Sequence, residues 1–144
     1  MTLARIEAEI DACSGDASDA KRLLALSEQV LELWIIARGD TPTHETREGF
    51  RLLALHRQGA RDLPSFNACR ETCREIAYHY NLIETSRDAA QNAAQNAALN
   101  VRNARMMALV ARHLLLFVSG KMQSEKLGEF CCASRPLRQD EVTS

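Results

Sequence analysis

The longest uninterrupted helical pattern in the sequence lies between Ser65 and Ser119. This stretch contains neither glycine nor proline, the two residues that most often end a helix. Apolar residues recur along it at alternating steps of three and four from Phe66 to Val118, and Arg87 is the one charged residue in the series. A 3.5-residue repeat of this length is typical of a coiled-coil seam. The pattern predicts an all-α protein that ends in a long coiled-coil-like helix or a helix pair.

The sequence leaves open whether this region is one helix or two. Asn81, Thr85 and Ser86 are weak helix formers whose side chains compete for backbone hydrogen bonds, and Arg87 breaks the seam beside them. A kink or short loop between Asn81 and Arg87 is therefore one alternative, and an unbroken rod is the other. The following segment, DAAQNAAQNAALN, has only alanine at its seam positions. Alanine favours a helix but removes little apolar area from water, so this segment cannot anchor a core by itself.

A second apolar stripe joins the seam after the alanine-rich segment. Together the two stripes cover about half of the helix circumference, while Arg102, Arg105 and Arg112 fall on the other side as a solvated face. An arc of this width exceeds what one partner helix needs. We interpret it as a surface that binds another protein, or alternatively as a face buried in the protein's own bundle or in a homodimer. The predicted protein-binding residues are Leu99, Asn100, Asn103, Met107, Val110, Ala111, Leu114, Phe117 and Val118.

Three shorter helices are expected before the long helical region, each marked by apolar residues at helical spacing. The first covers residues 3–13, and the second runs from a cap at Asp16 or Ser18 to about Arg38. Together with the long region they predict an antiparallel helical bundle.

The third short helix is expected to run from a cap at Asp40 or Thr41 to about Arg61. Gly49 and Gly59 interrupt its pattern. Its buried residues are expected to be Phe50, Leu52, Leu53 and Leu55. One bundle domain is therefore expected over residues 1–120, and a mostly disordered polar tail over residues 121–144.

Composition narrows the functional classes. The 144 residues are 46% hydrophobic and 26% charged, which suits one small helical domain. The formal charge of −1 provides no global basic field, so no nucleic-acid partner is expected. The longest apolar stretch, Met106 to Val118, contains Arg112 and His113, so no membrane insertion is expected. The absence of a secretory pattern in the first 13 residues and the odd number of cysteines favour a cytoplasmic location.

No motif predicts catalysis, a cofactor or a metal. The sequence lacks a phosphate loop, a GxSxG elbow, an HExxH pair and a dinucleotide fingerprint. Glu75 and His79 share a helix face, but such pairs are frequent by chance. Cys69 and Cys73 are spaced more widely than the common CxxC zinc pair and fall on the predicted seam, so core packing is favoured. We expect a non-enzymatic binding protein, with a structural or regulatory homo-oligomer as the first alternative and a metal-binding bundle enzyme as the second.

The C-terminal pattern AALNVRNARMMALVARHLLLFVSGK resembles the last helix of the FlgN family of flagellar type III export chaperones. The similarity covers about residues 89–121 and centres on the series Asn100, Asn103, Met106 and Met107. It implies a small cytoplasmic all-helical chaperone that binds helical ends of hook–filament junction proteins before export. It also implies that the two asparagines match the family motif and that the apolar face beyond them binds the client. The sequence departs from that family upstream of Asp88, and the Tyr-Gly stretch often found after the family's last helix is absent.

Overall fold

The computed structural model describes residues 1–13, 15–88 and 93–127. Within these residues the chain is helical, with one isolated β-bridge between Arg47 and Phe50. The all-α prediction is therefore confirmed. The elements are α1 (Leu3–Ala12), η1 (Ala17–Asp19), α2 (Ala20–Ala37), α3 (Arg51–Gly59), η2 (Pro64–Cys69), α4 (Arg70–Asp88) and α5 (Ala93–Glu125), where η denotes a short 3-10 helix.

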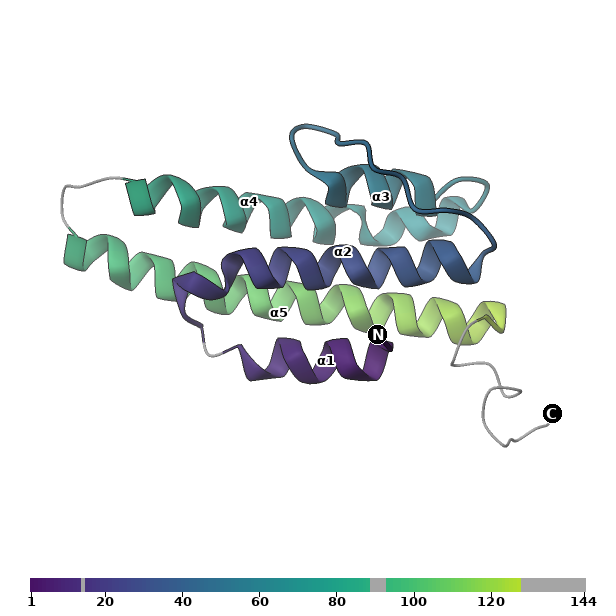
Figure 1. The fold of residues 1–144 in the computed structure, drawn as a ribbon, viewed down its shortest axis with the longest axis horizontal. Coiled ribbons are helices and arrows are strands. Elements are labelled where there is room, and N and C mark those ends of the chain that lie inside the picture. The colour runs from purple at the N-terminus through teal and green to yellow at the C-terminus, as the bar shows by residue number, and fades with distance from the viewer. Residues whose placement is uncertain (14, 89–92, 128–144) are drawn as a thin grey trace.

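The longest helix, α5, is the centre of the bundle. It packs against α4, α2 and α1, which lie around it, while α3 lies over α2 and α4 (Figure 1). The successive helices α1 and α2 run in opposite directions, and so do α4 and α5 (Figure 1). Every long helix therefore buries one face against α5, as an antiparallel bundle requires.

The sequence left open a kink or loop between Asn81 and Arg87, and the structure has none there, because α4 continues through these residues to Asp88. The two-helix alternative holds, since α5 begins at Ala93; residues 89–92 lie outside the described part of the chain. This end of the α4–α5 hairpin projects beyond α1 and α2 (Figure 1). The sequence between the end of α4 and the start of α5 carries no large apolar side chain that would have to be buried.

The third helix also begins later than predicted. The expected cap at Asp40 or Thr41 is wrong, and α3 starts at Arg51. Glu48 and Gly49 have φ angles of 54° and 85°, which are incompatible with a right-handed helix. Two backbone hydrogen bonds between Arg47 and Phe50, of 2.9 and 3.0 Å, close this turn directly before the helix. Gly49, which weakened the predicted pattern, is the residue that adopts the left-handed conformation most easily.

Aromatic side chains join α3 to the rest of the bundle. The rings of Trp34 and Phe66 are stacked with centroids 4.7 Å apart, and Phe117 meets Phe66 edge-on at 5.6 Å. Trp34 Nε1 also donates a 2.9 Å hydrogen bond to the carbonyl of Gly59, the last residue of α3. Large side chains from α2, η2 and α5 thus form the core beneath α3, and their burial is a major source of stability.

The predicted seam has the correct phase in α4 and in most of α5. Its members in η2 and α4 are buried at Phe66, Cys69, Cys73, Ile76 and Ile83, and those in α5 are buried at Ala104, Ala111, Leu115 and Val118. Near the start of α5, however, Ala97 and Val101 are exposed. The phase fails there because the seam does not continue through one straight helix but restarts after the chain has reversed direction.

The last helix also extends further than expected. Gly120 lies inside α5, which ends at Glu125, and Met122 is buried. The helix is closed where Lys126 adopts a φ of 56° and the Leu127 N–H donates to the carbonyl of Met122. A mostly disordered tail was expected over residues 121–144; residues 121–125 belong to α5 instead, and residues 128–144 lie outside the described part of the chain.

Candidate functional site

Most of the residues predicted to bind a partner lie in the protein's own core. Six of the nine are at most 5% exposed, namely Asn100, Met107, Val110, Ala111, Leu114 and Val118. Asn103 and Phe117 are half-buried, and Leu99 is exposed. The wide apolar arc is therefore covered by the surrounding helices, because α5 packs against three of them at once. A partner can contact the six buried residues only if one of these helices moves.

The two asparagines of the FlgN-like pattern also point inward. Asn103 Oδ1 lies 3.4 Å from His79 Nδ1 on α4, which makes it part of the α4–α5 interface. Asn100 is 5% exposed, and its side-chain oxygen has no hydrogen-bond partner among the described residues. An unpaired buried carbonyl oxygen destabilises the fold.

A different face of α5 is open to solvent. Its large apolar residues are between 42% and 49% exposed. They alternate with exposed polar residues at steps of three and four, so that all of them fall on one side of the helix. We call this set the outer stripe; it consists of Leu99, Arg102, Met106, Leu109, His113 and Leu116.

Sequence reasoning treated this side of α5 as a solvated arginine face and therefore missed the stripe, apart from Leu99. The sequence does contain a pattern that indicates the stripe, because the residues from Leu99 to Leu116 repeat at the same heptad spacing as the seam. A helix that is apolar on nearly all sides is expected to be covered on all sides. In the described part of the chain, α5 is covered by α1, α2 and α4 but not along the outer stripe.

The surroundings of the outer stripe are positively charged. The sequence has no aspartate or glutamate from Ala93 to Ser124. Arg112 is bound to α1 through Asp11 at 2.7 Å and Glu7 at 3.1 Å, so its charge is compensated. Arg102, in contrast, is exposed and forms no ion pair with any described residue. The open face of α5 thus combines apolar side chains with uncompensated positive charge.

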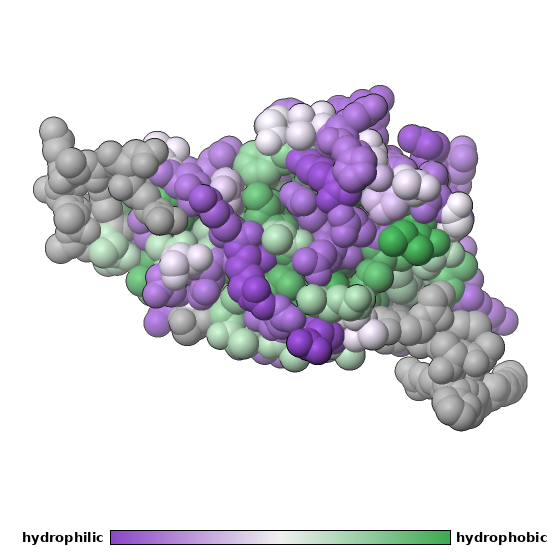
Figure 2. All heavy atoms as spheres, in the orientation of Figure 1, coloured by the Kyte–Doolittle hydropathy of each residue, from purple (hydrophilic) through white to green (hydrophobic). Residues whose placement is uncertain are grey.

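A second notable surface is polar. Hydrophilic side chains gather over α3 and the segment before it (Figure 2). A cleft of about 1070 Å³ lies here between residues 41–47, α3 and the start of α4. Its lining includes five arginines and no tyrosine, tryptophan or phenylalanine. This surface is separate from the outer stripe, since the two share no residue.

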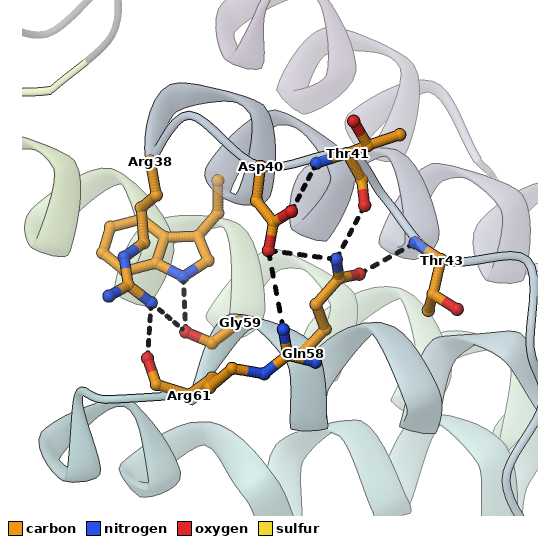
Figure 3. Close-up of polar contacts among 8 residues, drawn as sticks. Arg38, Asp40, Thr41, Thr43, Gln58, Gly59 and Arg61 are labelled. Carbon is orange, nitrogen blue, oxygen red and sulfur yellow. Dashed lines mark hydrogen bonds and ion pairs between the residues drawn. The ribbon is translucent and has the colours of Figure 1, made fainter.

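One wall of the cleft is held by a hydrogen-bond network around Gln58 (Figure 3). The Gln58 side-chain amide donates to the carbonyl of Thr41 at 2.7 Å and accepts from the N–H of Thr43 at 2.8 Å. Arg38 donates to the carbonyls of Gly59 and Arg61, at 2.9 and 3.0 Å (Figure 3). The segment that precedes α3 is therefore fixed to the helix although it has no regular secondary structure itself.

The two seam cysteines behave as core residues. Cys69 and Cys73 are buried, and the Cys69 thiol donates to the carbonyl of Phe66 at 3.3 Å. The hydrogen bond to Cys69 and burial together raise the pKa of Cys73 well above the ordinary thiol value. His56 Nε2 lies 3.3 Å from the same Phe66 carbonyl. Among the described residues no group of three or more His, Cys, Asp or Glu side chains is placed to hold a metal ion.

Comparison with known proteins gives no assignment: no family model, curated protein or solved structure matches the chain. None of the helices in the described ranges is long and apolar enough to cross a membrane.

Proposed function

We propose that the chain is a non-enzymatic binding protein that holds a helical segment of another protein on the outer stripe of α5. This proposal keeps the predicted role of α5 but moves the contact surface from the inner face to the opposite side. The observation that carries it is the run of exposed apolar residues at heptad spacing on the central helix. Such spacing suits a second helix lying alongside the first.

The outer stripe has a length that suits a short helix. From Leu99 to Leu116 it extends about 26 Å at the ordinary helical rise. A partner helix of about five turns covers this length. Its apolar residues would cover the parts of Leu99, Met106, Leu109 and Leu116 that are still exposed, between 42% and 49% of each residue. This corresponds to roughly half of the 1.5–3 kcal/mol for burying such a side chain completely, or about 1 kcal/mol each.

Charge complementarity indicates what kind of helix fits. Arg102, Arg105 and His113 are exposed along α5, which carries no acidic residue before Glu125. An amphipathic helix with acidic residues beside its apolar stripe would place carboxylates next to these side chains. A second copy of α5 would instead bring like charges together, which disfavours the homo-oligomer alternative. The proposed occupant is therefore an acidic amphipathic helix of a different protein.

The resemblance to FlgN-type chaperones supports a narrower version of the proposal. In that version the protein is a cytoplasmic export chaperone, and the bound helix belongs to a client that awaits secretion. In that version Asn103 would support the α4–α5 interface through His79, and neither asparagine would contact the client, since both face inward.

Site-specific photo-crosslinking tests the proposal. A benzophenone amino acid replaces Leu109, in the middle of the stripe, in cells that naturally express the chain. Ile36 on α2 serves as the control position, because it is 55% exposed but lies outside the stripe. We expect an adduct at position 109 that is absent at position 36, with the label on an acidic amphipathic segment of another protein.

Affinity measurements then separate a specific site from general adhesion. A peptide of the labelled segment should bind the wild-type protein and lose at least tenfold in affinity to Leu109→Asp, a change at an exposed position that should leave the circular dichroism melt nearly unchanged. An adduct with a second copy of the chain, equal adducts at positions 109 and 36, or unchanged affinity of the variant would each contradict the proposal.

A further inference from the structure

We propose that the arginine-lined cleft between residues 41–47, α3 and the start of α4 binds a compact oligoanion, a small molecule that carries several phosphate or carboxylate groups. This inference is independent of the role proposed for α5. It rests on the charge of the cleft, on three arginines that have no direct ion-pair or hydrogen-bond partner among the described residues, and on the hydrogen bonds that hold the wall of the cleft.

The lining of the cleft is strongly basic. It includes Arg47, Arg57, Arg61, Arg70 and Arg74, with Glu45 as the one acidic residue of the lining. Five guanidinium groups around one volume of about 1070 Å³ repel one another unless anions compensate them. The composition is unexpected in a chain whose formal net charge is −1.

Two of the five arginines are compensated within the protein. Arg74 binds Glu48 at 2.9 Å, and its guanidinium holds the pKa of that carboxyl below its ordinary value. Arg61 lies 3.8 Å from Asp40 (Figure 3). These pairs hold Asp40 and Glu48, at the two ends of the segment before α3. Arg61 and Arg74 therefore have a structural role.

The other three arginines of the cleft are not held in direct ion pairs of this kind. Arg47, Arg57 and Arg70 are exposed, and none of their side chains forms a direct ion pair or hydrogen bond with a described residue. Arg47 and Arg70 act on Glu48 only at longer range, where their charges help Arg74 to hold the pKa of that carboxyl below its ordinary value. The three arginines come from three separate parts of the chain: the turn before α3, α3 itself and the start of α4. Guanidinium groups bind phosphate and carboxylate oxygens through paired N–H donors, so three of them around one cleft form a suitable site for several anionic groups.

The wall of the cleft is held independently of these three residues. Gln58 fixes residues 41 and 43, and Arg51 donates to the carbonyl of Thr43 at 2.8 Å (Figure 3 shows the Gln58 bonds). The site is therefore formed before a ligand arrives, which lowers the cost of binding. It also follows that Arg57 and Arg70 can be changed without loosening the wall.

The character of the lining limits the class of ligand. Threonine side chains at positions 41, 43 and 46 offer hydroxyl groups, whereas no phenylalanine, tyrosine or tryptophan is present to stack on a base. Proteins that bind single-stranded nucleic acid rely on such stacking. The cleft therefore suits a compact oligoanion, whose binding does not depend on an aromatic base, better than it suits an oligonucleotide.

Isothermal titration calorimetry of the full chain tests the assignment, with tripolyphosphate and citrate as probes for the phosphate and carboxylate forms. We expect one of them to bind with one site per chain, and to bind more weakly at higher salt concentration. The double variant Arg57→Gln/Arg70→Gln should weaken binding at least tenfold. The control Arg5→Gln/Lys21→Gln removes the same charge from α1 and α2 and should leave the affinity unchanged.

Four results would overturn the inference. They are the absence of binding by either probe at millimolar concentration, an equal loss in the cleft and control variants, full affinity of the cleft variant, and tighter binding of an oligothymidylate than of tripolyphosphate. Circular dichroism melts of both double variants verify that any loss is not caused by unfolding.

Discussion

Two glycines inside helices illustrate how differently single residues are constrained in this bundle. A Cβ on Gly59 would lie 2.9 Å from Cδ1 of Trp34 and 3.2 Å from Phe66, both in the buried aromatic group. Gly120 has nothing within 4 Å of the same position. We therefore expect Gly59→Ala to lower the free energy of unfolding by about 1–3 kcal/mol through overpacking. Gly120→Ala should raise it by about 0.5–1 kcal/mol, because alanine is the better helix former.

Urea unfolding of the two alanine variants measures both effects. Because the substitution is identical, the difference between the variants isolates the role of Trp34 and Phe66. Stabilisation by Gly59→Ala would mean that the end of α3 does not pack against the indole as closely as described.

Neighbouring carboxylates on α2 provide a pH-dependent case. Arg51 binds Glu32 directly, and lies 3.5 Å from Glu28. Burial raises the pKa of Glu28 above its ordinary value of 4.5, and Arg51 offsets this in part. A raised folded-state pKa means that the charged form is disfavoured on folding, so the contribution of Glu28 to stability falls as pH rises through that pKa.

We therefore expect the stability of Glu28→Gln relative to the wild type to increase as the pH rises from the ordinary glutamate pKa of 4.5 to neutrality. Thermal melts across this range measure the difference. Glu32→Gln is the matched control, and it should be less stable than the wild type at neutral pH because it removes the direct partner of Arg51. If the difference in stability between Glu28→Gln and the wild type does not change with pH, the pKa of Glu28 is not raised in the folded protein.

At the scale of elements, helical periodicity in the sequence predicted which segments are helices and which of their faces are buried. It did not predict where α3 begins or where the α4–α5 hairpin lies. The first two helices and the buried face of α4 followed from apolar spacing at residues such as Ile6, Val30 and Ile76. The start of α3 did not follow from apolar spacing. It is set by the positive φ angles of Glu48 and Gly49, which the spacing of apolar residues does not reveal. The position of the hairpin was missed because the burial of Ile83 outweighs the weak helix propensity of its exposed neighbours Asn81 and Thr85.

The candidate surfaces were harder to predict than the helices. The apolar width of α5 was clear from the sequence, but spacing alone does not say which side its neighbours cover. The inner residues, such as Leu114, became core because α2 and α4 approach from that side, while Leu109 and Leu116 were left open. The cleft combines Arg47, Arg57 and Arg70 from three elements, and no local pattern links them.

At the scale of the molecule, the described helices share one apolar core, which runs from Leu3 through Trp34 and Phe66 to Met122. Unfolding is therefore expected to be a single cooperative transition. Ile76→Ala in α4 and Leu115→Ala in α5 should each destabilise by about 2–5 kcal/mol, the range for removing a buried aliphatic side chain. The far-ultraviolet circular dichroism signal and the fluorescence of Trp34, the single tryptophan, should change together in both variants.

Separate midpoints for the two signals would show that the region around α3 unfolds independently of α5. Leu116→Ala is a suitable control for this series, because that leucine is 49% exposed on the same helix. It should cost much less than Leu115→Ala, although the two positions are adjacent.

The central position of α5 has a consequence for how the chain acquires its structure during synthesis. Arg112 binds Asp11 across 101 positions of sequence, and α5 supplies the surface on which α1 and α2 bury their apolar faces. Contacts between such distant residues slow folding, because a long stretch of chain must be ordered to form them. The ribosome makes α5 after the other described helices, so the apolar faces of the first helices have no permanent cover until α5 has been synthesised. A nascent chain of this kind depends on rapid completion, or on transient shielding by the cell's folding machinery, to avoid association through those faces.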